Sequence, residues 1–295
     1  MLTSKSFIKV LLIPLLIGSA VLISMNTYKE PEIKVEHFPK ESEKQNLNSD
    51  IQFGVYNELS PLMNFVLFNK MANDITEKTS LLTHLNLKKS YSEFNTLLED
   101  GQIDLAYLYL DQYSFQNNME GYSIVFSPSF PTPPRSLIVV KDDSIQEISN
   151  LSNQVFGFTE PSSVNSQGIE EYLEAIGESK ETFFGNYYYS FYVDESIFAL
   201  QSNIVKGVSI DSLNLSIINN FNNKSVVPLL GNLQVVKEFK SGPQPVILIS
   251  NKLSIDVKEK IYDYFRDFPV DKKQEVIAET IQVSSFDEIN NDRLK

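Results

Sequence analysis

The stretch QVFGFTEPSSVNSQGIEEYLEAIG, residues 154–177, contains a strand, a polar loop and a helix in succession. Gln154–Thr159 is a short apolar run with polar neighbours, as expected of a buried strand. The helix that follows has its apolar side at Ile169 and Leu173. Strand and helix alternate in the same way from Ile51 onward, which is typical of α/β sheets. The stretch therefore predicts an α/β body for this chain.

Other elements follow from apolar periodicity and capping signals. Further strands are predicted at residues 51–56, 82–87, 103–110, 136–141, 205–210 and 245–250. Ser60 and Pro61 are typical of a helix start. The apolar stripe expected on that helix is Leu62, Phe65, Val66, Met71 and Ile75. Other helices are predicted before Gly101, at residues 194–202 and after Ser254.

The length of the chain favours two lobes. It has 295 residues, 42% of them apolar, and its body is larger than a single core usually supports. The Pro-rich stretch Ser127–Arg135 predicts a break that is neither helix nor central strand. We expect the chain to cross between lobes near residues 141–151 and 235–242. Lobe 1 is then residues 50–141 plus 240–295, and lobe 2 is residues 142–239.

Composition excludes several function classes. The formal net charge is −13, which disfavours nucleic acid as a partner because phosphate contacts require clustered Lys and Arg. The chain has no Cys, so disulfides, thiolate zinc sites and thiol nucleophiles are excluded. Only His37 and His84 could serve a His-based metal site or base, and both are read as linker or strand residues. No catalytic motif is recognised, so no enzyme activity, metal or cofactor is expected.

The N-terminus predicts export. Lys5 and Lys9 precede an apolar run at residues 10–25, the pattern of a targeting segment. Residues 1–26 are therefore interpreted as a signal peptide or a membrane anchor, the apolar part running from residue 7 to 25. Residues 27–49, rich in Lys, Glu, Asn and Pro, predict a flexible linker. The body is expected in the periplasm or at the extracytoplasmic face of the membrane.

Candidate ligand residues lie in the loops after strands, where α/β sheets bind their ligands. These loops are residues 56–58, 109–113, 162–166 and 211–212. A helix start at Ser163, Asn165 and Ser166 offers N–H groups and hydroxyls to an anion, although the same residues also suit ordinary capping. Asp211 either accepts a hydrogen bond from a ligand or caps a helix. Tyr56 and Tyr109, at strand ends, line a cleft or pack in the core.

Aromatic residues are also concentrated at residues 187–192, which contain four Tyr and one Phe. Such clusters can bind sugars or quaternary amines. The alternative is packing within a lobe, since Tyr and Phe are abundant throughout the body.

Several stretches together resemble one known family. These are LLEDGQIDLAYLYLDQY (97–113), RSLIVVKDDSIQEISNLSNQVFGF (135–158), TEPSSVNSQGIEEYLEAIG (159–177), VDESIFAL (193–200), VKGVSIDSL (205–213) and SGPQPVILISNKLSIDVKEKI (241–261). In this order they resemble the PhnD-like phosphate, phosphite and phosphonate-binding proteins of ABC importers. The resemblance implies a two-lobed, type 2 periplasmic-binding fold with mixed, mainly parallel sheets, preceded here by an N-terminal apolar helix.

The resemblance also implies ligand residues. It places Ser163, Asn165 and, more weakly, Ser166 where the family grips an anionic head, and it adds Asp194 and Asp211. The sequence departs from the family pattern at Val193, where the family has His, and at Glu160, where the family has Asp. These departures put the phosphonate ligand in doubt more than the fold.

The expected function is capture of a small, anionic ligand for an ABC importer, with an ABC permease as the partner. The lobes would close on the ligand by hinge motion. The alternative is a membrane-tethered sensory or signalling subunit with the same fold, a diverged ligand site and a membrane sensor protein as its partner.

Overall fold

The fold is described from a computed structural model. It covers residues 50–109, 121–161, 163–223, 232–240, 242 and 244–289, all of them within one compact unit, residues 46–295. The predicted N-terminal helix, signal or anchor and the linker lie outside these residues. Within the described part of the chain, no helix has the length and apolar character needed to cross a membrane.

The first sheet has six strands in the order β11-β4-β10-β3-β1-β2. Its strands are β1 (Asp50–Tyr56), β2 (Leu82–Leu87), β3 (Leu105–Tyr109), β4 (Tyr122–Ser129), β10 (Pro245–Ser250) and β11 (Ser285–Glu288). β2, β1 and β3 pair in parallel, and β10, β4 and β11 join them in antiparallel pairings. The helices of this lobe are α2 (Pro61–Thr79), α3 (Tyr91–Glu99), α8 (Ile255–Arg266) and α9 (Lys272–Ile281).

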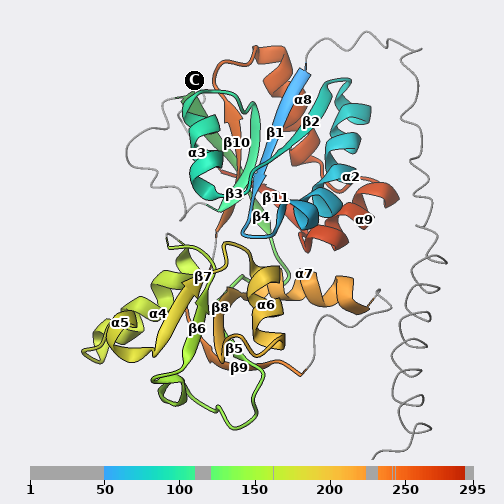
Figure 1. The fold of residues 1–295 in the computed structure, drawn as a ribbon. Coiled ribbons are helices and arrows are strands. Elements are labelled where there is room, and N and C mark those ends of the chain that lie inside the picture. The colour runs from blue at the N-terminus through green and yellow to red at the C-terminus, as the bar shows by residue number, and fades with distance from the viewer. Residues whose placement is uncertain are drawn as a thin grey trace, which may run out of the picture. The chain divides into compact units, whose positions relative to one another are not determined.

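Both faces of this sheet are covered, as its apolar central strands require. Residues of β3 alternate: Leu105 and Tyr107 belong to the core shared with α2 and α8, whereas Ala106 and Leu108 belong to the core shared with α3. Figure 1 shows α3 on one side of the sheet and α2, α8 and α9 on the other. The covering helices leave the strand ends of β1 and β3 at the edge that faces the second sheet.

The second sheet has five strands in the order β7-β6-β8-β5-β9. Its strands are β5 (Ser136–Val140), β6 (Val155–Phe158), β7 (Asn186–Tyr189), β8 (Gly207–Asp211) and β9 (Gln234–Glu238). The helices around it are the 3₁₀ turn η3 (Ile148–Leu151), α4 (Val164–Ala175), α5 (Lys180–Phe183), α6 (Val193–Gln201) and α7 (Ser212–Asn223). Ile169 and Leu173 of α4 pack on Phe156 and Phe158 of β6, as their spacing predicts.

The expected two sheets with mixed strand directions are confirmed, but the expected excess of parallel pairs is not found. In the second sheet β7, β6 and β8 are parallel, while β5 pairs antiparallel with both β8 and β9. Apart from β11, the strands in antiparallel pairings include those next to the passages between the sheets, β4 and β10 in the first sheet and β5 and β9 in the second. Direct passage between sheets requires no crossover helix, so these strands need not run parallel to their neighbours.

The first passage between sheets differs from the prediction. β5 belongs to the second sheet, so the chain crosses within residues 130–135, between β4 and β5, and not at residues 141–151. The apolar run of β5 resembles the buried strands of either lobe. Its pairing with β8 and β9 assigns it to the second sheet. The second crossing lies between β9 and β10, close to the expected 235–242. The two crossing segments touch: a Cβ on Gly242 would meet the carbonyl oxygen of Pro134 at 2.2 Å, so this close approach requires glycine.

Two local predictions were wrong. Ser127–Ser129 continue β4, and Pro128 is accommodated because the pairing of β4 with β10 has ended by Phe126. On α2 the buried stripe does not include Leu62, Phe65 and Val66, which are exposed. The residues that α2 buries in the core are Leu67, Phe68, Met71, Ala72 and Ile75. These residues repeat at helical spacing, whereas the three exposed residues fall on a different side of the helix.

Candidate ligand-binding site

The predicted ligand residues occupy strand ends and helix starts. Tyr56, Tyr109 and Asp211 are the last residues of β1, β3 and β8. Ser163 is the N-cap of α4, with Asn165 and Ser166 in its first turn, and Asp194 is in the first turn of α6. All are buried except Asp194, which is half-buried. The predicted candidates Ser162 and residues 110–113 lie outside the described part of the chain.

The loop between β1 and α2 contacts the second sheet. The carbonyl oxygen of Glu58 accepts a hydrogen bond from the Val193 N–H at 2.7 Å. The carbonyl oxygen of Asn57 accepts one from Asn214 Nδ2 at 2.6 Å. The Ser60 N–H donates to Asp194 Oδ1 at 2.9 Å. The predicted site residue Asp194 thus joins the two sheets through the backbone of this loop.

The start of α4 faces the same loop. Asn165 Nδ2 donates to Glu58 Oε2 at 3.1 Å, and a hydrogen bond from Ser163 also reaches the Glu58 carboxyl. Ser163 Oγ in addition accepts from the Asn165 N–H at 3.0 Å, the usual capping bond. Ser166 Oγ donates to the carbonyl oxygen of Glu160 at 2.6 Å, which fixes the loop before α4. Capping and contact with the other sheet therefore coexist at this helix start.

Asp211 lies next to this contact. Its Oδ1 accepts from the Asn214 N–H at 2.7 Å and its Oδ2 from Asn214 Nδ2 at 2.9 Å, so it stabilises the start of α7. The side chain of Asn165 also hydrogen-bonds to Asp211, so one amide group lies between the Asp211 and Glu58 carboxyls. We call Asn57, Glu58, Ser163, Asn165, Asp211 and Asn214 the junction cluster. Every member is at most 2% exposed.

The two carboxyls of the junction cluster have strongly perturbed acidity. Burial raises the pKa of Glu58 to about 8; the neighbouring charge of Asp211 adds to the rise, and hydrogen bonds from Ser163 and Asn165 oppose it. Burial raises the pKa of Asp211 to about 6, against hydrogen bonds from Asn214 and Asn165. Perturbed carboxyls of this kind are concentrated at functional sites.

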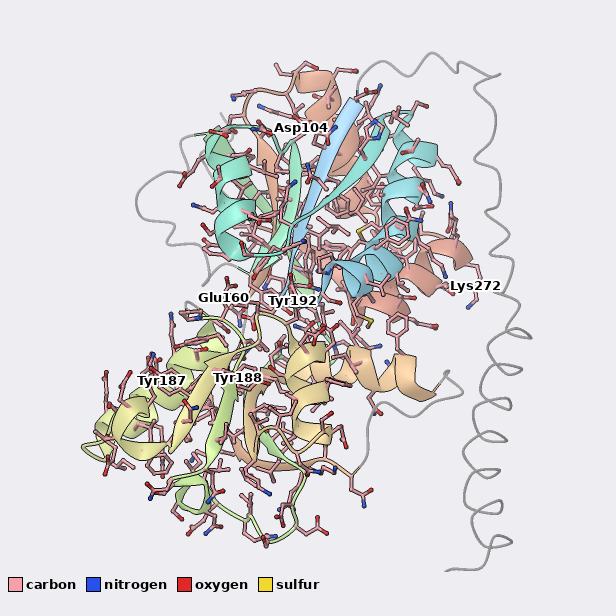
Figure 2. All side chains as sticks on the ribbon, in the orientation of Figure 1. Asp104, Glu160, Tyr187, Tyr188, Tyr192 and Lys272 are labelled. Carbon is pink, nitrogen blue, oxygen red and sulfur yellow. The ribbon has the colours of Figure 1, made fainter. Side chains whose placement is uncertain are left out.

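A second contact between the sheets surrounds Glu160, which Figure 2 labels, together with Tyr192, at the junction of the two sheets. The Tyr56 hydroxyl donates to Glu160 Oε2, and the Tyr91 N–H donates to Glu160 Oε1 at 3.3 Å. Burial raises the pKa of the Glu160 carboxyl. The Tyr192 hydroxyl donates to the carbonyl oxygen of Lys89. The hydroxyl of Tyr56 therefore binds Glu160 in the loop between β6 and α4, while its ring packs on Tyr91 and Phe94.

Two residues of the aromatic run at residues 187–192, Tyr187 and Tyr189, contact a cation of this chain. Lys180 Nζ lies 5.6 Å from the ring centroids of both Tyr187 and Tyr189, and 2.6 Å from Glu170 Oε1. Such an arrangement stabilises the α4–α5 side of the second sheet. The structure thus favours packing within the lobe for Tyr187 and Tyr189, whereas Tyr192 contacts Lys89 of the other lobe and Phe191 is exposed.

The sequence does not single out three members of the junction cluster, Asn57, Glu58 and Asn214, or the nearby Glu160. The sequence predicts only a loop at residues 56–58, because a position after a strand does not indicate which side chain faces inward. Asn214 falls in a helix, where Asn is usually a surface residue. No local sequence pattern marks Glu58. In the structure its backbone distinguishes it, because its φ is 63°, in the left-handed region that residues other than Gly, Asn and Asp seldom occupy.

The chain forms two mixed sheets that are joined by two crossing segments and meet at buried polar residues from both. This arrangement defines the class of two-lobed periplasmic-binding folds. Solved structures share this fold. A binding protein of a phosphonate ABC transporter from Pseudomonas aeruginosa has a TM-score of 0.72 at 17% identity over 83% of each chain. The PhnD1 protein of Prochlorococcus marinus in complex with methylphosphonate has a TM-score of 0.71 at 13% identity, covering 83% of this chain and 94% of that one.

The protein belongs to the family of periplasmic substrate-binding proteins of phosphonate ABC transporters, whose model matches residues 53–294. The family resemblance of the sequence is thereby confirmed, and with it solute binding for an ABC importer and a periplasmic location. The family is one of substrate-binding proteins and not of enzymes. No curated protein matches the sequence.

Proposed function

We infer that this protein binds its solute within the junction cluster and presents the closed form to an ABC permease. The observation that supports this most is a set of fully buried polar side chains contributed by both sheets. Burying polar groups is unfavourable unless they are hydrogen-bonded, and chains seldom place so many together without a functional reason. The family supplies the transport context.

The proposed ligand residues belong to both lobes. Tyr56 and Tyr109 come from the first sheet, and Ser163, Asn165, Ser166, Asp194 and Asp211 come from the second. With the crossing revised to residues 130–135, we propose that lobe 1 contains residues 50–129 and 245–289 and lobe 2 contains residues 136–238. Bending at the two crossing segments would expose the junction cluster and close it again over the solute.

Phosphonates are the first anions to test as solutes. The Prochlorococcus marinus neighbour is a complex with methylphosphonate, and the start of α4 offers this chain's N–H and hydroxyl donors to an anion. Phosphonates and phosphate therefore head the panel of solutes. Amines and amino acids complete it, because the junction cluster also carries carboxyls.

The test is a thermal-shift screen of the full-length protein with this panel. A solute present at a hundred times its Kd stabilises the folded state by about 2.7 kcal/mol, a shift of several degrees in Tm. Asn165→Ala should remove the shift. Asn73→Ala, on the exposed side of α2, is the matched control and should retain it. An unchanged Tm with every solute, or a shift that Asn165→Ala leaves intact, contradicts the proposed function.

The role of the N-terminal segment is a separate proposal. We propose that residues 7–25 hold the protein at the periplasmic face of the membrane. Fractionation of cells distinguishes a retained anchor from a cleaved signal peptide. An anchored chain stays with the membranes at full size, whereas a cleaved one is soluble and shorter on a gel.

A further inference from the structure

A cavity lies between β7 and α6, and none of its lining residues belongs to the junction cluster. Its volume is about 480 Å³, within the range of about 300–1,000 Å³ that is typical of sites for small molecules. Aromatic and aliphatic side chains form most of its lining: Tyr188, Tyr192, Phe198, Ala199 and Ile204. Figure 2 labels Tyr188 on β7 and Tyr192 in the loop that leads to α6.

Two large apolar side chains of this lining are exposed to solvent. Phe198 is 62% exposed and Ile204 is 57% exposed. Glu195 and Phe198 are three residues apart on α6, so they lie on the same side of the helix and reach the cavity together. Exposed apolar side chains gathered around a cavity with a few polar groups are typical of a binding surface.

Carboxylates dominate the charge around the cavity. Burial raises the pKa of the Tyr188 and Tyr192 hydroxyls, and the charge of Glu195 adds to the rise in both. Three further carboxylates act on Tyr192, those of Glu93, Asp194 and Glu160. Within the described part of the chain, no Lys or Arg lines the cavity. The field there therefore favours a positively charged occupant.

Several polar atoms of the lining already have hydrogen-bond partners. Ser190 Oγ donates to the carbonyl oxygen of Tyr192 at 2.9 Å and lies 2.6 Å from Ser196 Oγ. The Tyr192 hydroxyl donates to the carbonyl oxygen of Lys89. The cavity therefore suits a ligand that is held by its charge and by contact with aromatic rings, and a quaternary ammonium group binds in this way.

The other side of β7 holds an ammonium group of this chain in the same manner. Tyr187 and Tyr189 point away from Tyr188, because side chains alternate along a strand, and they belong to a different core cluster. Lys180 Nζ lies 5.6 Å from both of their ring centroids and 2.6 Å from Glu170 Oε1. Two Tyr rings and one Glu carboxylate are thus sufficient to surround an ammonium group in this lobe.

We propose that the cavity between β7 and α6 is a ligand site separate from the junction cluster, and that it binds a small organic cation with a quaternary ammonium group. Glu195 supplies the opposite charge, and the rings of Tyr188, Tyr192 and Phe198 surround the alkyl groups of the cation. These groups match those around Lys180, with a cavity in place of the lysine side chain. The inference goes beyond the proposed function, because it concerns a different site.

Calorimetric titration of the full-length protein with choline tests this inference. The matched probe is 3,3-dimethylbutan-1-ol, an uncharged isostere in which carbon replaces the nitrogen. We expect choline to bind at least about tenfold more tightly than the alcohol, because only choline is attracted by the carboxylate and the aromatic rings. Equal Kd values for the two compounds, or no binding of choline at millimolar concentration, would overturn the inference.

Variants of the lining link binding to this cavity. Glu195→Gln and Phe198→Ala should each weaken choline binding about fivefold. Both side chains are exposed, so neither change removes core packing, and unfolding curves without ligand verify that each variant folds. The matched controls are Glu171→Gln, on the exposed side of α4, and Phe65→Ala, on the exposed side of α2, and both should leave the Kd unchanged. Native affinity in Glu195→Gln and Phe198→Ala contradicts the proposed site.

Asn165→Ala separates this inference from the proposed function. The substitution alters the junction cluster and not the cavity, so we expect choline to bind this variant as tightly as the native protein. Loss of choline binding would instead place choline in the junction cluster, which overturns the separate site and supports the proposed function. If choline does not bind at all, the separate site is wrong, and the solute panel still decides the proposed function.

Discussion

At the scale of single residues, Glu58 combines a left-handed backbone, near-complete burial and an acid group next to another acid. Each of these features is unfavourable by itself. Their coincidence at the contact between the two sheets supports the proposal that the solute binds here.

The free energy of unfolding should therefore depend on pH through Glu58 and Asp211. Both pKa values are raised in the folded protein, so the folded state holds more protons than the unfolded state between about pH 4 and pH 8. The contribution to stability is complete below the unfolded pKa values and is lost as the pH rises through about 6 and then about 8. The rises, from 4.5 to about 8 and from 3.8 to about 6, span more than five pKa units, so the loss amounts to several kcal/mol at about 1.4 kcal/mol per unit.

Denaturant unfolding across this pH range measures the effect. Glu58→Gln cannot ionise and should show a markedly flatter profile than the native protein, whereas Glu171→Gln should retain the native profile. A native profile that rises toward pH 8, or a Glu58→Gln profile with the native slope, would refute the coupling.

Part of the candidate site was predictable at this scale. Ser163, Asn165 and Asp211 follow strands or begin helices, and that local position led to them directly. The role of Glu58 was not predictable in the same way, because Glu58 and Asn165 are 107 residues apart and meet only when the lobes do. Likewise, no local pattern indicates that Asn214 faces Asn57 across the junction.

At the scale of elements, apolar periodicity identified most strands and helices because each has one or two buried faces. It failed where the neighbours of an element decide the outcome. The apolar run of β5 would suit a buried strand of either lobe, and α2 carries apolar residues on more than one side. Pairing partners and packing partners, which lie far away in the sequence, settle both cases.

β1 provides a test of how tightly the elements that position Glu58 are packed. A Cβ on Gly54 would meet Phe94 Cε2 at 2.8 Å and two carbons of Ile103 at 3.1 Å. Gly54→Ala should therefore lower the free energy of unfolding by about 1–3 kcal/mol through overpacking between β1 and α3. Chemical denaturation gives the value.

Gly121→Ala is the matched control. A Cβ at Gly121 meets no atom within 4 Å among the described residues, so its effect should stay within about 0.5 kcal/mol. Equal stability of the two variants would mean that β1 and α3 are less closely packed than described.

At the scale of the whole molecule, two lobes of similar construction meet through residues of the β1–α2 loop, the start of α4, the start of α6 and the end of β8. The two crossing segments touch at Gly242 and Pro134, so the two proposed hinge points lie side by side. The sequence predicted two lobes and the approximate place of the second crossing. It could not place the first, because strand pairing and not composition assigns β5.

The crystal structure of the full-length protein grown with saturating methylphosphonate tests the central claim most directly. We predict density for the ligand inside the junction cluster, within hydrogen-bond distance of Ser163 and Asn165, with the two lobes closed around it. Density for the compound elsewhere, with the junction cluster unchanged, would contradict the account.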